Sequence, residues 1–199
     1  MVELGIIQRV GRGVFKLGET IKFQPEISTT LTKKYNEIKS NFLFIELCIW
    51  NTAIINEFSQ HQSNRRLIII ETDKDANESI FYFLKERYDN IFLNPDRVIL
   101  EQYVIDIPNA IIIRPLLSES PLQEVKKVNT ITIEKMLVDI YCDTDLFGAF
   151  QGNEKKIIFS EAFKKYTINN NKLLRYASRR GRKEEIERFI SQIIGNNVK

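Results

Sequence analysis

Three short and almost continuously apolar segments constrain the fold of this chain most strongly. They are residues 41–50 (NFLFIELCIW), 66–72 (RLIIIET) and 90–93 (NIFL). Runs of this kind are typical of strands that are buried on both faces of a sheet. The residues between them have apolar side chains at helical spacing, which gives the order strand, helix, strand, helix, strand. This order predicts an α/β fold with a mostly parallel sheet flanked by helices.

Capping and turn residues set the expected boundaries of the flanking elements. Ser28 is expected to cap a first helix, a second helix to begin at about Thr52, and Asp75 to cap a third. Residues 103–107 (YVIDI) and 110–114 (AIIIR) are separated by a Pro-Asn pair. This arrangement predicts an antiparallel hairpin that is added to the sheet.

The last third of the chain changes to a helical pattern. A helix is predicted from about Thr132, with Glu134 and Lys135 on the side opposite its apolar stripe. Residues 159–168 predict a further helix, and residues 171–194 predict two helices broken near Gly181. We therefore expect a helical C-terminal third packed on the α/β layer.

The N-terminal residues 5–17 have the pattern of an isolated β-hairpin. Two short apolar runs flank a basic centre that contains Gly11 and Gly13, and glycine takes a positive φ freely in a turn. Three cations, Arg9, Arg12 and Lys16, are expected on or beside this turn.

Charge is distributed unevenly along the 199 residues. Residues 155–199 contain 12 Lys and Arg against 4 Asp and Glu, a net charge of +8, whereas residues 1–154 carry 17 against 22, or −5. Basic residues recur at intervals of three, four and three on one predicted helical face, as phosphate binding requires. These candidate nucleic-acid-binding residues are Lys172, Arg175, Arg179 and Arg182, with Arg180 widening the face.

Composition bounds the class of protein. Hydrophobic residues make up 43% of the chain, which is enough for a sizeable core. No apolar run reaches membrane-spanning length, and the first residues do not resemble a signal peptide. Cys48 and Cys142 lie in apolar segments, so we expect them to be reduced and buried in a cytoplasmic protein without a membrane partner.

The sequence contains no complete catalytic motif. Its single histidine, His61, has no second histidine or nearby cysteine, and neither a P-loop nor a dinucleotide fingerprint occurs. Asp139, Asp143 and Asp145 are interpreted as solvated loop or capping acids. We therefore expect a protein that is not an enzyme and has no catalytic residues, cofactor or metal.

One enzymatic alternative is left open by the acids near the predicted strand ends. Glu46, Glu71 and Asp73, with Lys74, have the residue types of a metal-dependent nuclease with a restriction-endonuclease-like α/β fold. The spacing departs from the acid-x-Lys pattern, because Thr72 stands two residues before the lysine. This alternative requires the acids to converge within metal-bridging distance.

An ordered set of motifs resembles the AbiEi-type family, the antitoxin and transcriptional-regulator partners of bacterial abortive-infection toxin–antitoxin systems. The motifs are GRGVFKLG, CIWNT, NEFSQHQ, RPLLSESPLQ, TIEKMLVDIYCD, FQGNE and LLRYASRRGR. The resemblance implies a winged helix-turn-helix followed by an α/β antitoxin domain. Residues 1–24 then correspond to the wing, and residues 25–199 to the antitoxin domain with its helical C-terminal part. A wing lies against the DNA backbone or minor groove, so the resemblance implies that Arg9, Arg12 and Lys16 bind nucleic acid.

The resemblance also implies partners. They are operator DNA and, as a functional partner, a cognate toxin that resembles a nucleotidyltransferase. A complete winged helix places a recognition helix before its wing, whereas only Met1 and Val2 precede Glu3 here. We therefore expect contact with the DNA backbone rather than base reading, in a shortened or degenerate member. A homodimer through the apolar hairpin is a further expectation.

Overall fold

The computed structural model describes residues 7–11, 14–17, 20–64, 66–104 and 106–196. A four-stranded sheet forms its centre, in which the last three strands are parallel and the first is antiparallel to its neighbour. The strands, in spatial order, are β3 (Leu47–Asn51), β4 (Ile68–Thr72), β6 (Ile111–Pro115) and β5 (Ile91–Leu93). The predicted α/β fold with a mostly parallel sheet is confirmed.

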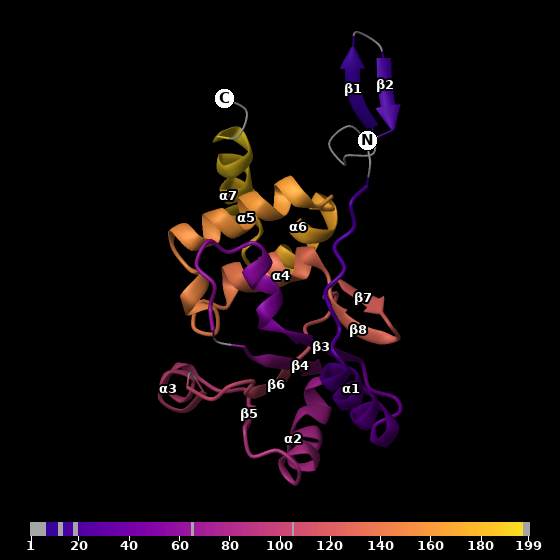
Figure 1. Cartoon of the computed structure of the whole chain (residues 1–199), viewed down its shortest axis with the longest axis vertical. Coiled ribbons are helices and arrows are strands. Elements are labelled where there is room, and N and C mark those ends of the chain that lie inside the picture. The colour runs from indigo at the N-terminus through magenta and orange to yellow at the C-terminus, as the bar shows by residue number, and fades with distance from the viewer. Residues whose placement is uncertain (1–6, 12–13, 18–19, 65, 105, 197–199) are drawn as a thin grey trace.

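Helices cover both faces of this sheet. Helices α1 (Thr29–Asn41) and α2 (Asn77–Lys85) lie on one face, and the C-terminal helices lie on the other (Figure 1). Successive strand residues point to opposite faces, so Ile68 and Ile70 pack in the cluster with α1 and α2, whereas Ile69 packs in the cluster with the C-terminal helices. Burial on both faces explains why these strands are almost wholly apolar in sequence.

Helix α1 forms as its sequence predicts. The Ser28 side chain accepts a hydrogen bond from the Leu31 backbone N–H, which satisfies one of the free donors of the first turn. Leu31, Tyr35 and Ile38 are all buried against the sheet. The second predicted helix is a 3-10 helix, η2 (Thr52–Glu57).

The strand predicted at residues 41–50 is shorter than its apolar run. Helix α1 continues to Asn41, and the chain then turns before β3 begins at Leu47. The Lys39 ammonium donates to the Ile45 carbonyl at 3.0 Å, which holds this turn against the end of α1. The Phe44 side chain is consequently 99% exposed, although it belongs to the apolar run.

The antiparallel hairpin predicted at residues 103–107 and 110–114 is wrong. The first of these segments begins within η4 (Leu100–Val104), a π-helical turn that follows α3 (Arg97–Ile99), and β6 pairs in parallel with β4 and β5. Leu100 and Val104 are four residues apart, so a helical turn brings both onto the sheet, where they are buried. Parallel pairing requires such a crossover instead of a tight turn.

Two further local features differ from the sequence interpretation. Asp75 lies inside the short helix η3 (Lys74–Ala76) and does not cap α2. The Asn77 amide instead donates to the Asp73 carbonyl at 3.1 Å and to the Lys74 carbonyl at 3.2 Å. The antiparallel pair β7 (Leu122–Val125) and β8 (Val128–Ile131) was not predicted, because its turn places two lysines at positive φ where glycine or asparagine is usual.

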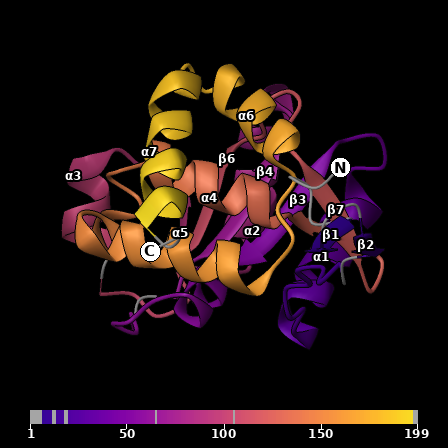
Figure 2. The ribbon, with the colours of Figure 1, turned by 90° about the horizontal axis from the view of Figure 1, so that it is seen from above.

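The helical C-terminal third is confirmed. It contains α4 (Ile133–Cys142), η5 (Gly148–Phe150), α5 (Asn153–Lys165), α6 (Asn170–Arg179) and α7 (Lys183–Asn196). Gly181 separates the last two helices at a φ of 68°, a conformation that glycine adopts without strain. Figure 2 shows the C-terminal helices gathered over the sheet. Within the described residues, no helix is both long and apolar enough to cross a membrane.

The predicted N-terminal hairpin is present as β1 (Ile7–Gly11) and β2 (Val14–Leu17). These strands stand apart from the body in Figure 1, and the homodimer expected through the hairpin stays a prediction. The chain joins the core at Phe23, which is buried against Phe58 and Tyr166. The globular part therefore begins just before the boundary expected at residue 24.

Candidate nucleic-acid interface

Helix α6 presents a row of cations on its outer face. Asn169 caps the helix by accepting from the Lys172 backbone N–H, and Leu173, Tyr176 and Ala177 are buried beneath it. Lys172, Arg175 and Arg179 are exposed on the opposite side, as their spacing predicts. Arg182 continues the row past Gly181 and is also exposed. We call Lys172, Arg175, Arg179 and Arg182 the basic row.

One acid, Glu119, faces the middle of the basic row. Its carboxylate lies 2.5 Å from Arg175 Nε and 3.1 Å from Arg179 Nη2. The hydrogen bond from Arg175 and the charges of both arginines hold the pKa of Glu119 below its ordinary value. The two arginine side chains remain 72% and 50% exposed, so these ion pairs are open to water. Exposed pairs of this kind contribute little to stability and exchange readily for other anions.

The two ends of the row differ in their pairing. The Arg182 guanidinium donates to both carboxylate oxygens of Glu185 at 2.8 Å. The Lys172 ammonium has no ion pair with any residue that the structure describes. Lys172 is therefore the cation of the row with the least local competition for an incoming anion.

Arg180, predicted as a nucleic-acid-binding residue that widens the basic face, does not lie on that face. Its side chain is only 10% exposed and turns under the helix, where its guanidinium pairs with Asp143 and lies 3.5 Å from Asp139. One residue corresponds to about 100° around a helix, so Arg180 leaves the face that Arg179 occupies. The inward position is set by the acids below it.

A buried ionic cluster lies beneath α6, between α4 and the sheet. The Lys135 ammonium is 2.9 and 2.8 Å from the two oxygens of Glu71 and 2.5 Å from Asp139. The Tyr176 hydroxyl donates to Asp139 at 2.8 Å. Arg114 lies 3.4 Å from Glu71 and 2.8 Å from Asp143. The ionic cluster is Glu71, Arg114, Lys135, Asp139, Asp143, Tyr176 and Arg180, with three acids and three bases in balance.

This cluster corrects the sequence interpretation of α4. Lys135 was expected on a solvated side and Asp139 as a solvated capping acid, but they are 0% and 1% exposed. Glu134 is also buried, at 6% exposure. The apolar residues of α4 itself are distributed around its whole circumference, which is typical of a helix that is buried rather than at the surface. That pattern was the available signal for buried charges on α4.

The pairing determines the charge states within the cluster. Burial alone lowers the pKa of Lys135, but the carboxylates of Asp139 and Glu71 raise it well above its ordinary value. Burial alone raises the pKa of Asp139, but Lys135 and Arg114 bring it below its ordinary value. Burial also raises the pKa of the nearby Cys48 thiol well above its ordinary value, so this cysteine is an inert, protonated thiol.

Glu46, Glu71 and Asp73, the acids of the nuclease alternative, do not converge into a metal site. Glu71 belongs to the ionic cluster, while Asp73 lies after the end of β4 and accepts from the Glu46 backbone N–H at 2.9 Å. Lys74 is exposed in the helical turn that follows. Among the residues placed in the structure, no three His, Cys, Asp or Glu side chains are arranged to hold a metal ion. No geometric observation therefore favours the nuclease alternative.

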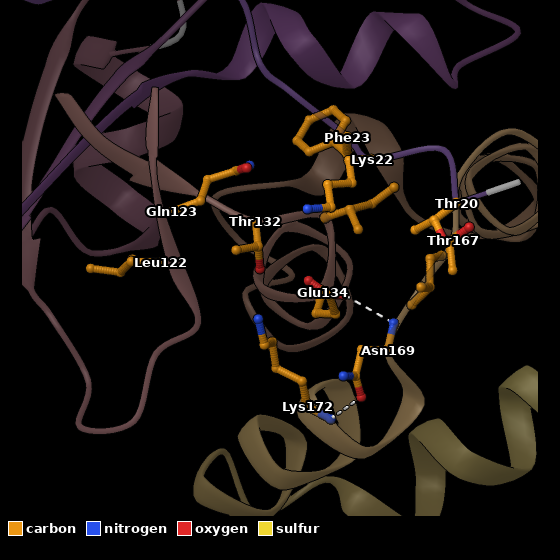
Figure 3. A pocket seen from close by; sticks show the side chains of 12 residues that line it. Thr20, Lys22, Phe23, Leu122, Gln123, Thr132, Glu134, Thr167, Asn169 and Lys172 are labelled. Atoms are coloured by element: carbon orange, nitrogen blue, oxygen red, sulfur yellow. Dashed lines mark hydrogen bonds between the residues drawn. The ribbon is translucent and has the colours of Figure 1, made fainter. Parts of the chain in front are cut away.

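A pocket of about 450 Å³ opens beside the first residue of the basic row (Figure 3). It lies where the linker after the hairpin meets β7, the start of α4 and the loop into α6. Lys22 and Lys172 approach it from opposite sides, with Thr132 and Glu134 between them (Figure 3). The buried Glu134 carboxylate accepts from the Asn169 backbone N–H at 3.0 Å. We call this hollow the Lys22–Lys172 pocket.

A second hollow of about 330 Å³ lies at the carboxyl ends of β5 and β6. Open α/β sheets commonly bind ligands at this edge. Its charged lining has both signs, with Arg97 and Arg114 against Asp96, Asp143 and Asp145. Since Arg114 and Asp143 already pair with each other, one cation and two acids remain, and this hollow offers no surplus of positive charge to a phosphate.

The N-terminal cations are placed only in part. Arg9 lies on β1 and Lys16 on β2, in a hairpin whose register is irregular between Arg9 and Gly11. Arg12 lies outside the described residues. The linker from this hairpin reaches the body at Thr20 and Lys22, in the wall of the Lys22–Lys172 pocket. The hairpin is therefore attached at the same end of the molecule as the start of the basic row.

Comparison with known proteins yields one family. Residues 1–196 match a group described as a family of unknown function (DUF6577). No curated protein matches the chain. The match covers the hairpin, the α/β layer and the C-terminal helices together.

Proposed function

We propose that this chain, which belongs to the DUF6577 family, is a non-enzymatic regulator that holds nucleic acid by its phosphate backbone. The proposal extends to the role that its motifs resemble, an AbiEi-type antitoxin and transcriptional regulator in bacterial phage defence. In that role it works in the cytoplasm and counters a nucleotidyltransferase-like toxin.

One observation carries the proposal: three of the four cations of the basic row are exposed on helix α6, whose other face is anchored in the core. Leu173, Tyr176 and Ala177 are each at most 1% exposed, so α6 has a fixed orientation. The cations are consequently held on a rigid surface, and a duplex backbone meets them without a loop having to order. Cations placed in this way bind phosphates and do not read bases.

The acids near the row leave it available to phosphate. Glu119 pairs with Arg175 and Arg179 at the surface, where a phosphate oxygen can replace its carboxylate at little cost. A phosphate oxygen can replace the Glu185 carboxylate on Arg182 in the same way. The four cations then predict a log–log salt slope of roughly −3 to −4, because each neutralised phosphate contributes about −0.9. Affinity is expected near about 10⁻⁴ to 10⁻⁶ M at physiological salt.

Fluorescence anisotropy of a labelled DNA duplex tests this proposal across a range of salt concentrations. Changing Arg175 and Arg179 together to Ala should reduce the slope by about 2. The matched control is K33A/K85A, which removes two exposed cations from α1 and α2 on the other face of the sheet. The control should keep the wild-type slope. An equal loss in both double variants would mean that net charge, and not the basic row, holds the duplex.

A further inference from the structure

We propose that the Lys22–Lys172 pocket binds a single nucleotide at the end of a strand, with its phosphate held by lysine at the pocket mouth and the amine of its base against Glu134. The inference rests on the proposed function, because it supplies a site for the nucleotide next to the phosphates held by the basic row. It goes further in assigning base preference to a surface that otherwise contacts only the backbone.

The two lysines supply the positive charge of the pocket, and Lys172, at the end of the basic row, lies where a phosphate of the strand arrives. Lys22 comes from the linker and Lys172 from α6, and Figure 3 shows them on opposite sides of the same hollow. Neither ammonium has an ion pair with a residue that the structure describes. Glu134 is the one acid among the lining residues, so the pocket has a surplus of positive charge. The oxygens of a terminal phosphate can accept charge-assisted hydrogen bonds from these ammonium groups.

The base side is formed by hydrogen-bond acceptors. Glu134 Oε1 accepts from the Asn169 backbone N–H, and Oε2 carries no hydrogen bond to the described part of the chain. Gln123 Nε2 donates to the Ile131 carbonyl at 2.8 Å, which leaves the Gln123 amide oxygen as an acceptor. Two acceptors favour a base that presents an exocyclic amine, as cytosine, adenine and guanine do. Thymine has carbonyl oxygens in those places and should bind least.

The walls of the pocket are fixed before a ligand arrives. The Ile21 backbone N–H donates to the Thr167 hydroxyl at 3.2 Å, and the Thr167 N–H donates to the Ile21 carbonyl at 2.9 Å. These bonds hold the linker to the loop before α6, and Phe23 anchors it in the core. The volume of about 450 Å³ is within the range of small-ligand sites. A preformed site does not require the chain to order on binding.

Lys172 belongs to both the pocket and the basic row, which makes the two surfaces continuous. A strand whose backbone follows Arg179 and Arg175 arrives at Lys172, so its terminal nucleotide reaches the pocket mouth. The backbone of the strand would then contact the basic row, and its terminal base would contact the buried Glu134 carboxylate in the pocket.

Isothermal titration calorimetry of the full chain with dAMP, dCMP, dGMP, dTMP and inorganic phosphate tests the inference at low salt. The three amine-bearing nucleotides should bind more tightly than dTMP and more tightly than phosphate. K22A/K172A should weaken every nucleotide by at least about tenfold, because charge-assisted hydrogen bonds are lost. The control K33A/K85A should leave nucleotide affinity unchanged.

The variant E134Q gives the sharpest test. Glutamine keeps an oxygen for the Asn169 N–H but presents an amide N–H₂ to the base, so the preference should shift toward dTMP. Thermal unfolding establishes whether E134Q remains folded, and the wild-type comparison of dCMP with dTMP requires no variant. Nucleotides that bind no better than phosphate, or without discrimination in the wild-type chain, would overturn the inference. Duplex binding by the basic row is measured separately, so its salt slope survives a failure of the pocket.

Discussion

Replacing Lys135 with Met tests whether the ionic cluster is buried from water and dependent on its internal ion pairs, as the structure indicates. The ammonium is 0% exposed and lies within 2.9 Å of Glu71 and Asp139, which are themselves at most 2% exposed. Methionine has a similar length and no charge. The substitution therefore removes one cation and leaves the carboxylates buried with Arg114 and Arg180 alone.

The expected loss is large because a buried charge is left uncompensated. Removing one partner of a buried ion pair costs about 3–5 kcal/mol of unfolding free energy. In a chain of 199 residues, about 2–4 °C of melting temperature corresponds to 1 kcal/mol, so we expect K135M to melt roughly 6–20 °C lower. An exposed lysine such as Lys85 provides the matched control, and K85M should stay within about 0.5 kcal/mol of the wild type.

The pH dependence of the variant follows from the signs of the pKa shifts. The raised pKa of Lys135 contributes stability below its ordinary value of 10.5, which is lost as pH rises through the folded value. The lowered pKa of Asp139 contributes stability above its ordinary value of 3.8, which is lost as pH falls through the folded value. The wild-type contribution is therefore constant between these limits. The K135M penalty should shrink toward pH 5, because the unpaired carboxylates become easier to protonate.

Urea unfolding at pH 5, 7 and 9 measures these free energies and their slopes. A double variant, E71Q/K135M, should lose less than the sum of its single variants, because it removes an acid together with the base. A K135M loss below about 1 kcal/mol at pH 7, or a penalty that grows as pH falls, would refute the closed ionic cluster.

Four further substitutions separate surface roles from structural ones. R179A should reduce the DNA salt slope by about 1 with little change in stability, whereas R180A should lower the urea midpoint and leave the slope unchanged. E119Q should tighten DNA binding in anisotropy titrations, since it removes the acid that competes for Arg175 and Arg179; weaker binding would show that Glu119 positions the row instead. G181A should cost about 1 kcal/mol in urea unfolding, because an added Cβ has open space but must adopt a φ of 68°.

The strands were predictable where burial on both faces requires continuous apolar sequence. Residues 68–72 and 91–93 satisfy that condition and form strands. Residues 41–46 have the same composition but lie in the end of α1 and the turn that follows, where Phe44 projects into solvent. The apolar composition therefore indicated that residues 41–50 contain a strand, but it did not show that the strand begins at Leu47. That start is set by the pairing of β3 with β4.

The connection into β6 shows why topology was harder to predict. Residues 103–107 (YVIDI) are mostly β-branched and aromatic, so they resemble a strand in isolation. Their position between two parallel strands requires a crossover, and the spacing of Leu100 and Val104 suits a helical turn. The segment does not form the strand that its side chains favour, because β6 pairs in parallel with both β4 and β5.

The candidate nucleic-acid interface also has a part that the sequence predicts and a part that it does not. The basic row follows from helical spacing within one element, and the structure places all four of its cations at the surface. The ionic cluster joins Glu71 on β4 to Lys135 on α4, 64 residues apart, so no local pattern places them together. The position of Arg180 depends on those acids, and its inward turn could not be predicted from α6 alone.

The most direct test of nucleic-acid binding through α6 is an amide chemical-shift titration of the labelled full chain with duplex DNA at low salt. We predict that the shifts center on residues 169–182 and on Glu119, with little change in α1 and α2 on the opposite face. Shifts that center on α1 and α2, or none at DNA concentrations approaching 1 mM, would contradict the proposed function.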